Sequence, residues 1–226
     1  MSPELQEKLD IYMDLLLKWQ KSINLISANT IYEAWPRHFE DSLQLVDYIP
    51  SAFSIEEPDL FTVPYFDKPA APDIFSDEKE QKTVLFDLGS GAGFPGLVLA
   101  IALPDLEVTL IESDRKKCTF LSTVSRETST KVKIMDQRIE LASLETIPAI
   151  VTARALAPLD KLLEYCVHWA GRNPGLMMLF HKGENAEKEI EEARAHFNFD
   201  VEIFPSKTDK TGKILKILNL SGKSAP

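Results

Sequence analysis

Three glycines at alternate positions are the residues of this chain whose spacing points most directly to chemistry. They are Gly89, Gly91 and Gly93, and they follow an apolar run at 84–88 that contains Asp87. Glycine is required where the backbone takes dihedral angles closed to other residues, or where a ligand approaches the main chain closely. The pattern therefore predicts a β-strand that runs into a turn able to bind a nucleotide.

The residues around this turn distinguish between two ligands. Residues 91–96 match the G-x-G-x-x-G fingerprint, so an NAD(P)-dependent oxidoreductase is one interpretation. Asp87 would repel a pyrophosphate, however, whereas it could lie near the charged methionine part of S-adenosylmethionine. Glu112, 25 residues later, could accept hydrogen bonds from the ribose hydroxyls of either ligand. We expect no substrate domain after the last predicted strand, which ends at residue 220, so S-adenosylmethionine is favoured.

Alternating patterns predict the elements that position this turn. From residue 83, short β-rich runs alternate with helical periodicity, which is typical of a parallel sheet with helices on both faces. The predicted strands are 83–88, 107–112, 131–135, 149–153, 175–181, 199–204 and 213–220. The predicted helices are 95–103, 115–127, 158–170 and 184–197.

The end of the predicted sheet is informative about the fold class. No helical pattern separates the last two strands, so they should form an antiparallel hairpin. This arrangement resembles the α/β fold of class I S-adenosylmethionine-dependent methyltransferases, which is Rossmann-like and has a seven-stranded, mostly parallel sheet. Residues 83–226 are therefore interpreted as a methyltransferase core.

The chain before this core divides into two parts. Residues 3–23 place apolar side chains three or four positions apart, which predicts an amphipathic helix, and a second helical stretch should follow Asn29-Thr30 and end at Pro50. Residues 1–50 are thus expected to form an N-terminal helical cap. Residues 51–82 are acidic and contain four prolines, so we interpret them as a linker or insertion.

Several separate motifs, in one order along the chain, resemble a known family. They are DLGSGAGFPG at 87–96, Glu112-Ser113 followed by Lys116-Lys117 and Phe120-Leu121, Arg138-Ile139-Glu140, Arg154-Ala155, and, in the N-terminal part, Trp19, Asn24-Leu25, Arg37-His38 and Asp41-Ser42-Leu43. On these residues the chain resembles the bacterial ribosomal RNA small subunit methyltransferase G family, also called the glucose-inhibited division protein B family. The resemblance covers nearly the whole chain apart from residues 51–82. Two positions depart from the family pattern: this chain has Gln20 where the family usually has Asn, and Ala149 where it usually has Asp.

The resemblance implies an activity and a set of cofactor contacts. The family transfers a methyl group from S-adenosylmethionine to N7 of a guanine in the decoding-region loop of 16S rRNA. On this resemblance the cofactor contacts are Gly89, Phe94, Ile139, Glu140 and Arg154. The pattern around the glycine turn adds Asp87, Gly91, Gly93 and Glu112 to these candidates.

The chemistry at N7 determines what the protein must supply. N7 carries an unprotonated lone pair, so no general base is needed, and no residue is assigned as catalytic. Catalysis should come from positioning, for which Arg37, His38 and Arg154 are candidates. The predicted fourth strand also lacks the Asn/Asp-Pro-Pro-aromatic motif of amine methyltransferases, which disfavours amine methylation.

The net charge of −10 argues at first against a nucleic-acid partner. Residues 51–82 contain eight acids and three lysines, however, so this segment alone contributes −5. The rest of the chain therefore has room for basic patches near the carboxyl edge of the sheet, where open α/β folds bind ligands. The candidate RNA-binding cations there are Arg115, Lys116, Lys117, Arg138 and Lys182.

The remaining features concern location and partners. The N-terminus does not resemble a secretory signal, and no apolar run is long enough to cross a bilayer, so we expect a cytoplasmic protein. Cys118, Cys166 and the four histidines show no metal-ligand spacing, so no metal is expected. We expect a monomer that acts on 16S rRNA, and not on DNA or a membrane. The substrate could be naked rRNA, an assembly intermediate or the 30S subunit. A nonenzymatic nucleotide-binding regulator on the same fold also stays open as an alternative function.

Overall fold

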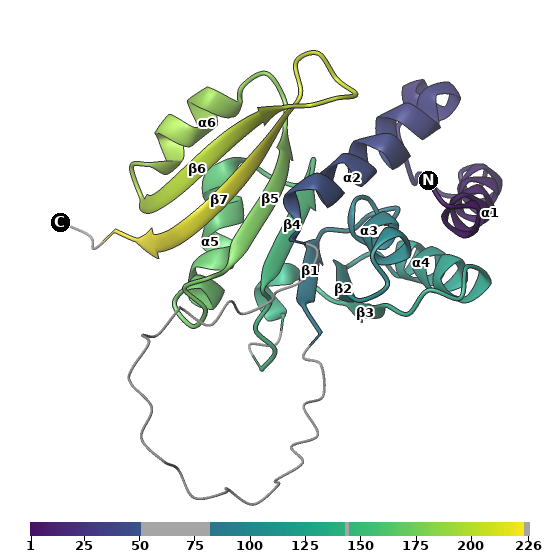
Figure 1. Ribbon diagram of the computed structural model, residues 1–226, viewed down its shortest axis with the longest axis horizontal. Coiled ribbons are helices and arrows are strands. Elements are labelled where there is room, and N and C mark those ends of the chain that lie inside the picture. The colour runs from purple at the N-terminus through teal and green to yellow at the C-terminus, as the bar shows by residue number, and fades with distance from the viewer. Residues whose placement is uncertain (51–81, 143–144, 224–226) are drawn as a thin grey trace, which may run out of the picture.

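The computed structural model describes residues 1–50, 82–142 and 145–223. Nearly all of the segment interpreted as a linker, residues 51–82, lies outside them, and the proposed division of the chain at residues 50 and 82 stays a prediction. One seven-stranded sheet forms the centre of the molecule, with the strand order β3-β2-β1-β4-β5-β7-β6 (Figure 1). Its strands are β1 (Val84–Leu88), β2 (Glu107–Glu112), β3 (Lys133–Asp136), β4 (Ile150–Arg154), β5 (Met177–Lys182), β6 (Phe197–Pro205) and β7 (Lys213–Gly222).

Strand direction follows the predicted class. Strands β1 to β5 pair in parallel, whereas β7 runs antiparallel to both β5 and β6. The predicted terminal hairpin is therefore confirmed. The chain leaves β1 toward β2 on one side and later enters β4 on the other, so the carboxyl ends of β1 and β4 form a topological switch point, where such folds bind ligands.

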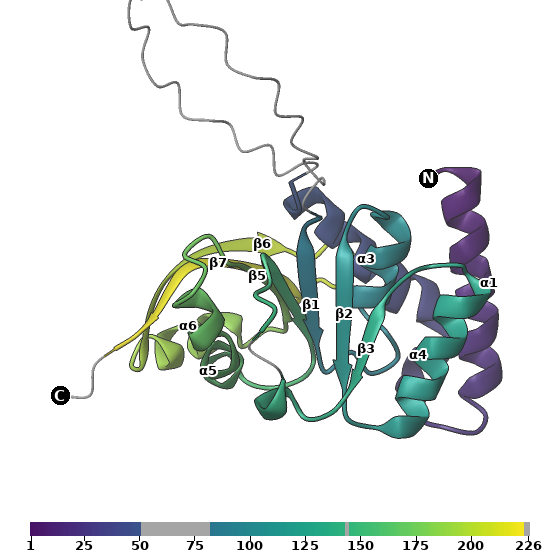
Figure 2. The same cartoon turned by 90° about the horizontal axis from the view of Figure 1, so that it is seen from below.

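Helices cover both faces of the sheet (Figure 2), and the side chains of β1, β4 and β5 are therefore buried on both sides. One apolar core joins α1 (Pro3–Trp19), α3 (Gly96–Ala102) and α4 (Arg115–Glu127) to the sheet. A second core lies under α5 (Leu159–Ala170) and α6 (Ala186–Ala193) on the opposite face. A single 3₁₀ turn, η4 (Ile139–Leu141), follows β3. No described helix is long and apolar enough to cross a membrane.

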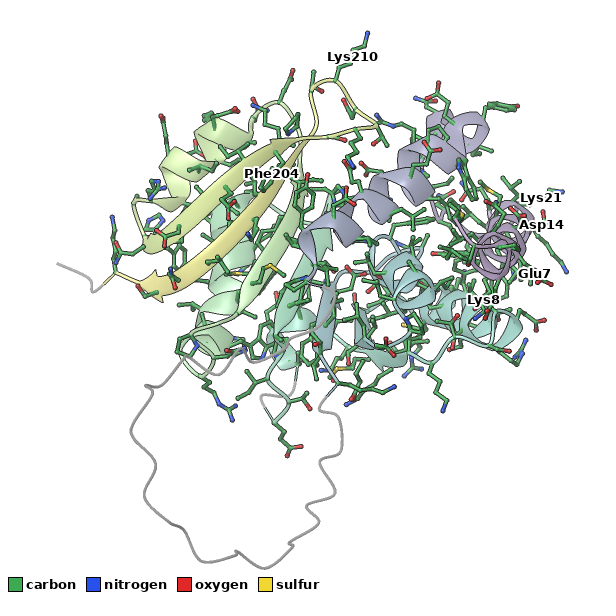
Figure 3. All side chains as sticks on the ribbon, viewed as in Figure 1. Glu7, Lys8, Asp14, Lys21, Phe204 and Lys210 are labelled. Carbon is green, nitrogen blue, oxygen red and sulfur yellow. The ribbon has the colours of Figure 1, made fainter. Side chains whose placement is uncertain are left out.

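The first helix is amphipathic, as predicted. Its apolar side chains Leu9, Tyr12 and Leu16 are fully buried in the first core, while polar residues such as Glu7 and Asp14 lie on its outer side (Figure 3). The helix ends at Trp19, four residues earlier than predicted. The side chain of Gln20 explains this, because its Oε1 accepts hydrogen bonds from the amides of residues 25 and 26 at 2.9 and 3.0 Å and so folds the chain back.

The second helical stretch of the cap is present but irregular. It consists of 3₁₀ helix η1 (Ala28–Glu33), π-helix η2 (Trp35–Glu40), a single α-turn α2 (Asp41–Leu43) and 3₁₀ helix η3 (Gln44–Tyr48). Within η2 the Trp35 and Phe39 rings stack at 5.2 Å between centroids, and Phe39 is fully buried. π-Helical turns are often found at functional sites, and this one lies against the end of β4, where Arg37 and His38 both contact Arg154.

Candidate active site

The glycine turn after β1 has the backbone conformation that its sequence predicts. Gly89, Gly91 and Gly93 have φ angles of +61°, +57° and +94°, a region that side chains with a Cβ rarely adopt. A Cβ on Gly91 would meet no atom closer than 3.8 Å, so its main chain faces open space. A Cβ on Gly89 would lie 2.5 Å from Leu156 Cδ1. The turn thus leaves open main chain at Gly91, whereas Gly89 packs closely against Leu156.

Gly93 has a different role, because it lies against the cap. A Cβ there would be 2.9 Å from Leu121 Cδ2 and would also collide with the Tyr12 hydroxyl. That hydroxyl donates a hydrogen bond to the Ala92 carbonyl, and the Tyr12 ring stacks on Phe94 at 5.4 Å. The cap helix α1 therefore fixes the shape of the glycine turn directly.

Phe94 is 4% exposed, and its ring is surrounded by protein groups. His38 stacks on it at 5.2 Å, Phe39 meets it edge-on at 5.1 Å, and the Arg154 guanidinium lies 5.1 Å from its centroid. Only a small part of the ring is left for a ligand, so Phe94 mainly connects the glycine turn to the cap.

Asp87 lies beneath the glycine turn. Its side chain is fully buried, its Oδ1 accepts a hydrogen bond from the Thr152 hydroxyl at 2.8 Å, and its Oδ2 has no partner among the described residues. A Cβ on Gly96 would come within 2.7 Å of that oxygen, so α3 packs directly over the carboxylate. Burial raises the pKa of Asp87 to about 6, although the hydrogen bond from Thr152 opposes the rise.

Glu112 holds the glycine turn against the end of β2. Its Oε2 accepts a hydrogen bond from the Gly91 amide and its Oε1 one from the Asp114 amide, both at 2.8 Å. Each carboxylate oxygen keeps a second lone pair, so the side chain can still accept a hydrogen bond from a ligand. Ile139 and Glu140 lie farther along this edge in η4, where Glu140 is exposed and accepts a hydrogen bond from the Tyr165 hydroxyl at 3.0 Å.

A cleft of about 500 Å³ opens at the switch point, within the size range of small-molecule sites. Its walls come from the cap, the glycine turn, the ends of β4 and β5, and the loop between β6 and β7. The predicted site residues that line it are Arg37, His38, Gly89, Gly91, Phe94, Lys117, Arg154 and Lys182. Those outside its walls are Asp87, Gly93, Glu112, Ile139, Glu140, Arg115, Lys116 and Arg138.

The cleft is cationic although the protein is acidic. Its walls hold five basic side chains and two carboxylates, and two of the basic side chains pair with Glu187 and Glu189 just outside the walls, so the excess is one positive charge, whereas the whole chain carries −10. The basic residues are Arg37, Lys117, Arg154, Lys182 and Lys213, and the acids are Asp41 and Asp209.

Arg154 is the central buried cation of this cleft. Its side chain is 16% exposed, and it donates from Nη1 to the Arg37 carbonyl at 3.0 Å and to Asp41 Oδ2 at 3.2 Å. Its Nη2 lies 2.8 Å from Nδ1 of His38, while Nε2 of His38 lies 2.9 Å from the Thr30 hydroxyl. Burial and the adjacent guanidinium lower the pKa of His38 to about 4, so the imidazole is neutral at neutral pH and accepts from Arg154.

Asp41 connects the cap to three other parts of the cleft. Besides Arg154 on β4, its carboxylate accepts a hydrogen bond from the Thr208 hydroxyl at 2.8 Å, and its carbonyl accepts one from Nε2 of His181 at 2.8 Å. A second contact between the cap and the β6–β7 loop, which contains both Thr208 and Asp209, is the ion pair between Arg37 and Asp209 at 2.7 Å. Arg37 and His38, the two predicted positioning residues of the cap, thus both hydrogen-bond to the core, Arg37 to Asp209 and His38 to Arg154.

The similarity of this chain to known proteins agrees with the geometry of the cleft. The family model described as rRNA small subunit methyltransferase G matches residues 5–57 and 71–215. The chain belongs to this family. The resemblance seen in the sequence is therefore confirmed, and its unmatched interior, residues 58–70, is shorter than the segment 51–82 that we set apart.

Relatives in the family match along almost the full chain. A ribosomal RNA small subunit methyltransferase G from Gluconobacter oxydans is 42% identical and covers 96% of this chain and 94% of its own. Those from Paramagnetospirillum magneticum and Rickettsia prowazekii are 40% and 38% identical over 100% and 96% of this chain, and 94% and 96% of their own. The crystal structure of an MtNAS mutant in complex with S-adenosylmethionine has a TM-score of 0.53 at 10% identity, over 95% of this chain and 75% of that one, and so shares the fold.

Within the family fold, the predicted RNA-binding cations are in different environments. Lys117 lines the cleft, whereas Arg115 is 90% exposed and lies 3.3 Å from Asp136. Lys116 and Arg138 are exposed on the surface. Lys182 is 7% exposed, because its ammonium is held by Glu189 at 2.6 Å and by the Ala157 carbonyl at 2.7 Å. Lys182 is therefore less suited than Lys117 to contact a phosphate.

Sequence reasoning missed the acidic and hydroxyl groups that organise the cleft. Thr208 and Asp209 lie in a loop that no motif marks, and Lys213, which is not among the predicted RNA-binding cations, also lines the cleft. Asp41 belongs to a motif of the family resemblance, which could have identified it. No cluster of His, Cys, Asp and Glu side chains within the described ranges could hold a metal ion, and both cysteines are buried and free.

Proposed function

We propose that this protein transfers the methyl group of S-adenosylmethionine to N7 of a guanine in the decoding-region loop of 16S rRNA. The observation that carries the proposal is a cationic cleft built directly over the glycine turn, at the switch point of a chain that belongs to this family. Membership of this family also argues against the alternative function, an NAD(P)-dependent oxidoreductase.

The residues present fit the proposed cofactor. The open main chain at Gly91 and the tight turn at Gly89 form a cradle, and the walls of the cleft leave that cradle accessible. Glu112 would accept a hydrogen bond from a ribose hydroxyl with its remaining lone pairs, and Ile139 with Glu140 would frame the adenine. When bound, S-adenosylmethionine supplies a methyl group on a positively charged sulfur.

The protein's own contribution is to hold the acceptor in line. Because N7 has no proton to lose, no side chain needs to act as a base, and positioning accounts for several kcal/mol of the barrier. Arg154 is suited to this task because Asp41, His38 and the Arg37 carbonyl hold its guanidinium in one orientation. Lys117 lies on the rim, where its charge can attract the RNA backbone. This substrate also places the reaction in the cytoplasm.

The direct test is methyl transfer from labelled S-adenosylmethionine to 30S subunits, and separately to naked 16S rRNA, taken from cells that lack the modification. We expect incorporation at one guanine, with N7 identified by borohydride and aniline cleavage. Gly89→Val should abolish cofactor binding measured by calorimetry, because a Cβ there is both strained and obstructed.

The matched control is Gly171→Ala, at a glycine outside the cleft where a Cβ would be 3.6 Å from its nearest atom. It should bind the cofactor like the wild type. A wild-type protein that binds S-adenosylmethionine but methylates neither RNA preparation would refute the proposed reaction and favour a nonenzymatic regulator. NADH binding with a fluorescence change would instead support an oxidoreductase.

A further inference from the structure

A second cleft continues the first across the ends of β4 and β5. It has a volume of about 330 Å³ and shares Ala155, His181, Lys182 and Gly183 with the first cleft. Its other walls come from the loop after β4 and the starts of α5 and α6. Since β4 and β5 lie on the opposite side of β1 from β2, this cleft lies away from Glu112 and the proposed ribose site.

We propose that this second cleft binds the target guanine by its Watson–Crick edge and thereby determines that the enzyme accepts guanine. The inference rests on the proposed function and names the residues that select its substrate. The base would enter with its 2-amino group toward Glu189 and its N1–H toward His181, in a cleft that the first one joins directly.

Glu189 supplies the first acceptor. Its Oε2 is occupied, because it accepts from the Lys182 ammonium at 2.6 Å and from the Leu159 amide at 2.7 Å. Its Oε1 has no hydrogen-bond partner among the residues that the structure describes, and the side chain is 23% exposed. The two donors on Oε2 fix the carboxylate, so Oε1 is an oriented acceptor in the wall of the cleft.

His181 supplies the second acceptor. Its Nε2 lies 2.8 Å from the Asp41 carbonyl, which can only accept, so Nε2 must carry the hydrogen. Burial lowers the pKa of His181, so the ring is neutral and Nδ1 carries a lone pair. Nδ1 is buried and has no partner in the described part of the chain. An unsatisfied buried acceptor of this kind is rare and calls for an N–H donor.

Guanine matches this arrangement on both of its edges. Its N1–H and 2-amino group lie on the side of the purine opposite to N7, so acceptors in the second cleft would leave N7 facing back toward the first cleft. Adenine lacks both donors on that edge and would meet the acceptors with its own N1 lone pair. Leu156, Pro158 and Leu162 provide apolar wall for the ring.

The test uses two RNA substrates that differ by one amino group. One 16S rRNA carries guanosine at the methylated position, and the other carries inosine there, which keeps N7, O6 and N1–H but lacks the 2-amino donor. Both are assembled into 30S subunits and assayed with wild-type protein. We expect kcat/KM to fall about tenfold or more on inosine, the usual effect of losing a hydrogen bond to a charged group.

Glu189→Gln tests whether that discrimination arises at this residue. The donors of Lys182 and Leu159 should attract the amide oxygen, which leaves the NH₂ group where Oε1 was and opposes the donors of guanine. The variant should lose about tenfold or more in kcat/KM on guanosine and should no longer distinguish guanosine from inosine. Glu192→Gln is the control, because Glu192 lies on the same helix in an exposed pair with Lys188.

Poor folding of Glu189→Gln would be revealed by thermal unfolding and by its cofactor affinity. The comparison of guanosine and inosine substrates with the wild-type protein tests the inference even in that case. Equal methylation of guanosine and inosine by the wild type would overturn the inference while leaving the proposed function intact. A Glu189→Gln protein that keeps the wild-type preference would overturn it as well. A wild type that methylates neither substrate overturns the proposed function, and this inference falls with it.

Discussion

Asp87 provides a test that separates a ligand contact from a buried structural carboxylate. Its position before the glycine turn suggests that it meets the charged part of the cofactor, but the structure places it under α3 and outside the walls of the cleft. Asp87→Asn keeps the shape and the acceptor for Thr152 and removes the ability to ionise. We therefore expect an effect on stability that depends on pH, and little effect on cofactor affinity.

The magnitude follows from the pKa change on folding. Burial raises the pKa of Asp87 from 3.8 to about 6, so the folded protein favours the protonated form. The stabilisation that this gives is fully present below pH 3.8 and is lost as the pH rises through about 6. By pH 7 the wild type should have lost about 3 kcal/mol through this group, at 1.36 kcal/mol for each pKa unit. The Asn variant has no such loss.

The assay is urea unfolding of wild type and Asp87→Asn at several values from about pH 4 to about pH 7. The difference in the free energy of unfolding, variant minus wild type, should increase by about 2 kcal/mol over this range, because a small part of the loss has already occurred at pH 4. Any constant cost of the amide cancels from this increase. A difference that does not change with pH would refute the desolvated carboxylate, and a tenfold loss of S-adenosylmethionine affinity at neutral pH would show that Asp87 contacts the ligand.

Two further predictions concern the glycine turn and the rim of the cleft. Gly93→Ala should destabilise the fold by about 2 kcal/mol or more, because a φ of +94° and a Cβ at 2.9 Å from Leu121 are both unfavourable; chemical denaturation measures this, and a neutral effect would contradict the packing against α1. Lys117→Gln should weaken RNA binding and reduce the slope of log K against log salt by about one, while cofactor affinity stays unchanged. An unchanged slope would remove Lys117 from the RNA-binding surface.

Local signals in the sequence were sufficient for most of the fold. Helix α4 spans the predicted residues 115–127, because Asp114 caps it by accepting hydrogen bonds from the amides of Lys116 and Lys117 at 2.8 and 3.2 Å. The predicted helix 184–197 ends instead at Ala193, since the chain enters β6 at Phe197. The mixed helical types of the cap were not predictable, because they depend on packing against a sheet that is distant in sequence.

The same distinction holds within the site. The positive φ angles of the three glycines were predictable, since residue type and spacing alone indicate them. The different surroundings of Gly93 and Asp87 were not, because they depend on contacts with α1 and α3. The hydrogen bonds of Asp41 were also out of reach, because Arg154 and Thr208 lie 113 and 167 positions away along the chain.

Of the five basic residues of the cleft, four pair with acids and one, Lys117, has no such partner among the described residues, so the two groups should behave differently in solution. Arg154 and Lys182 are buried, and their charges are balanced by Asp41 and Glu189, so they orient neighbouring groups and add little long-range attraction. Lys117 has no acidic partner of this kind in the described part of the cleft and is available to phosphates. Added salt should therefore slow encounter with RNA and leave the positioning of N7 unaffected, so KM should rise with ionic strength while kcat stays nearly constant.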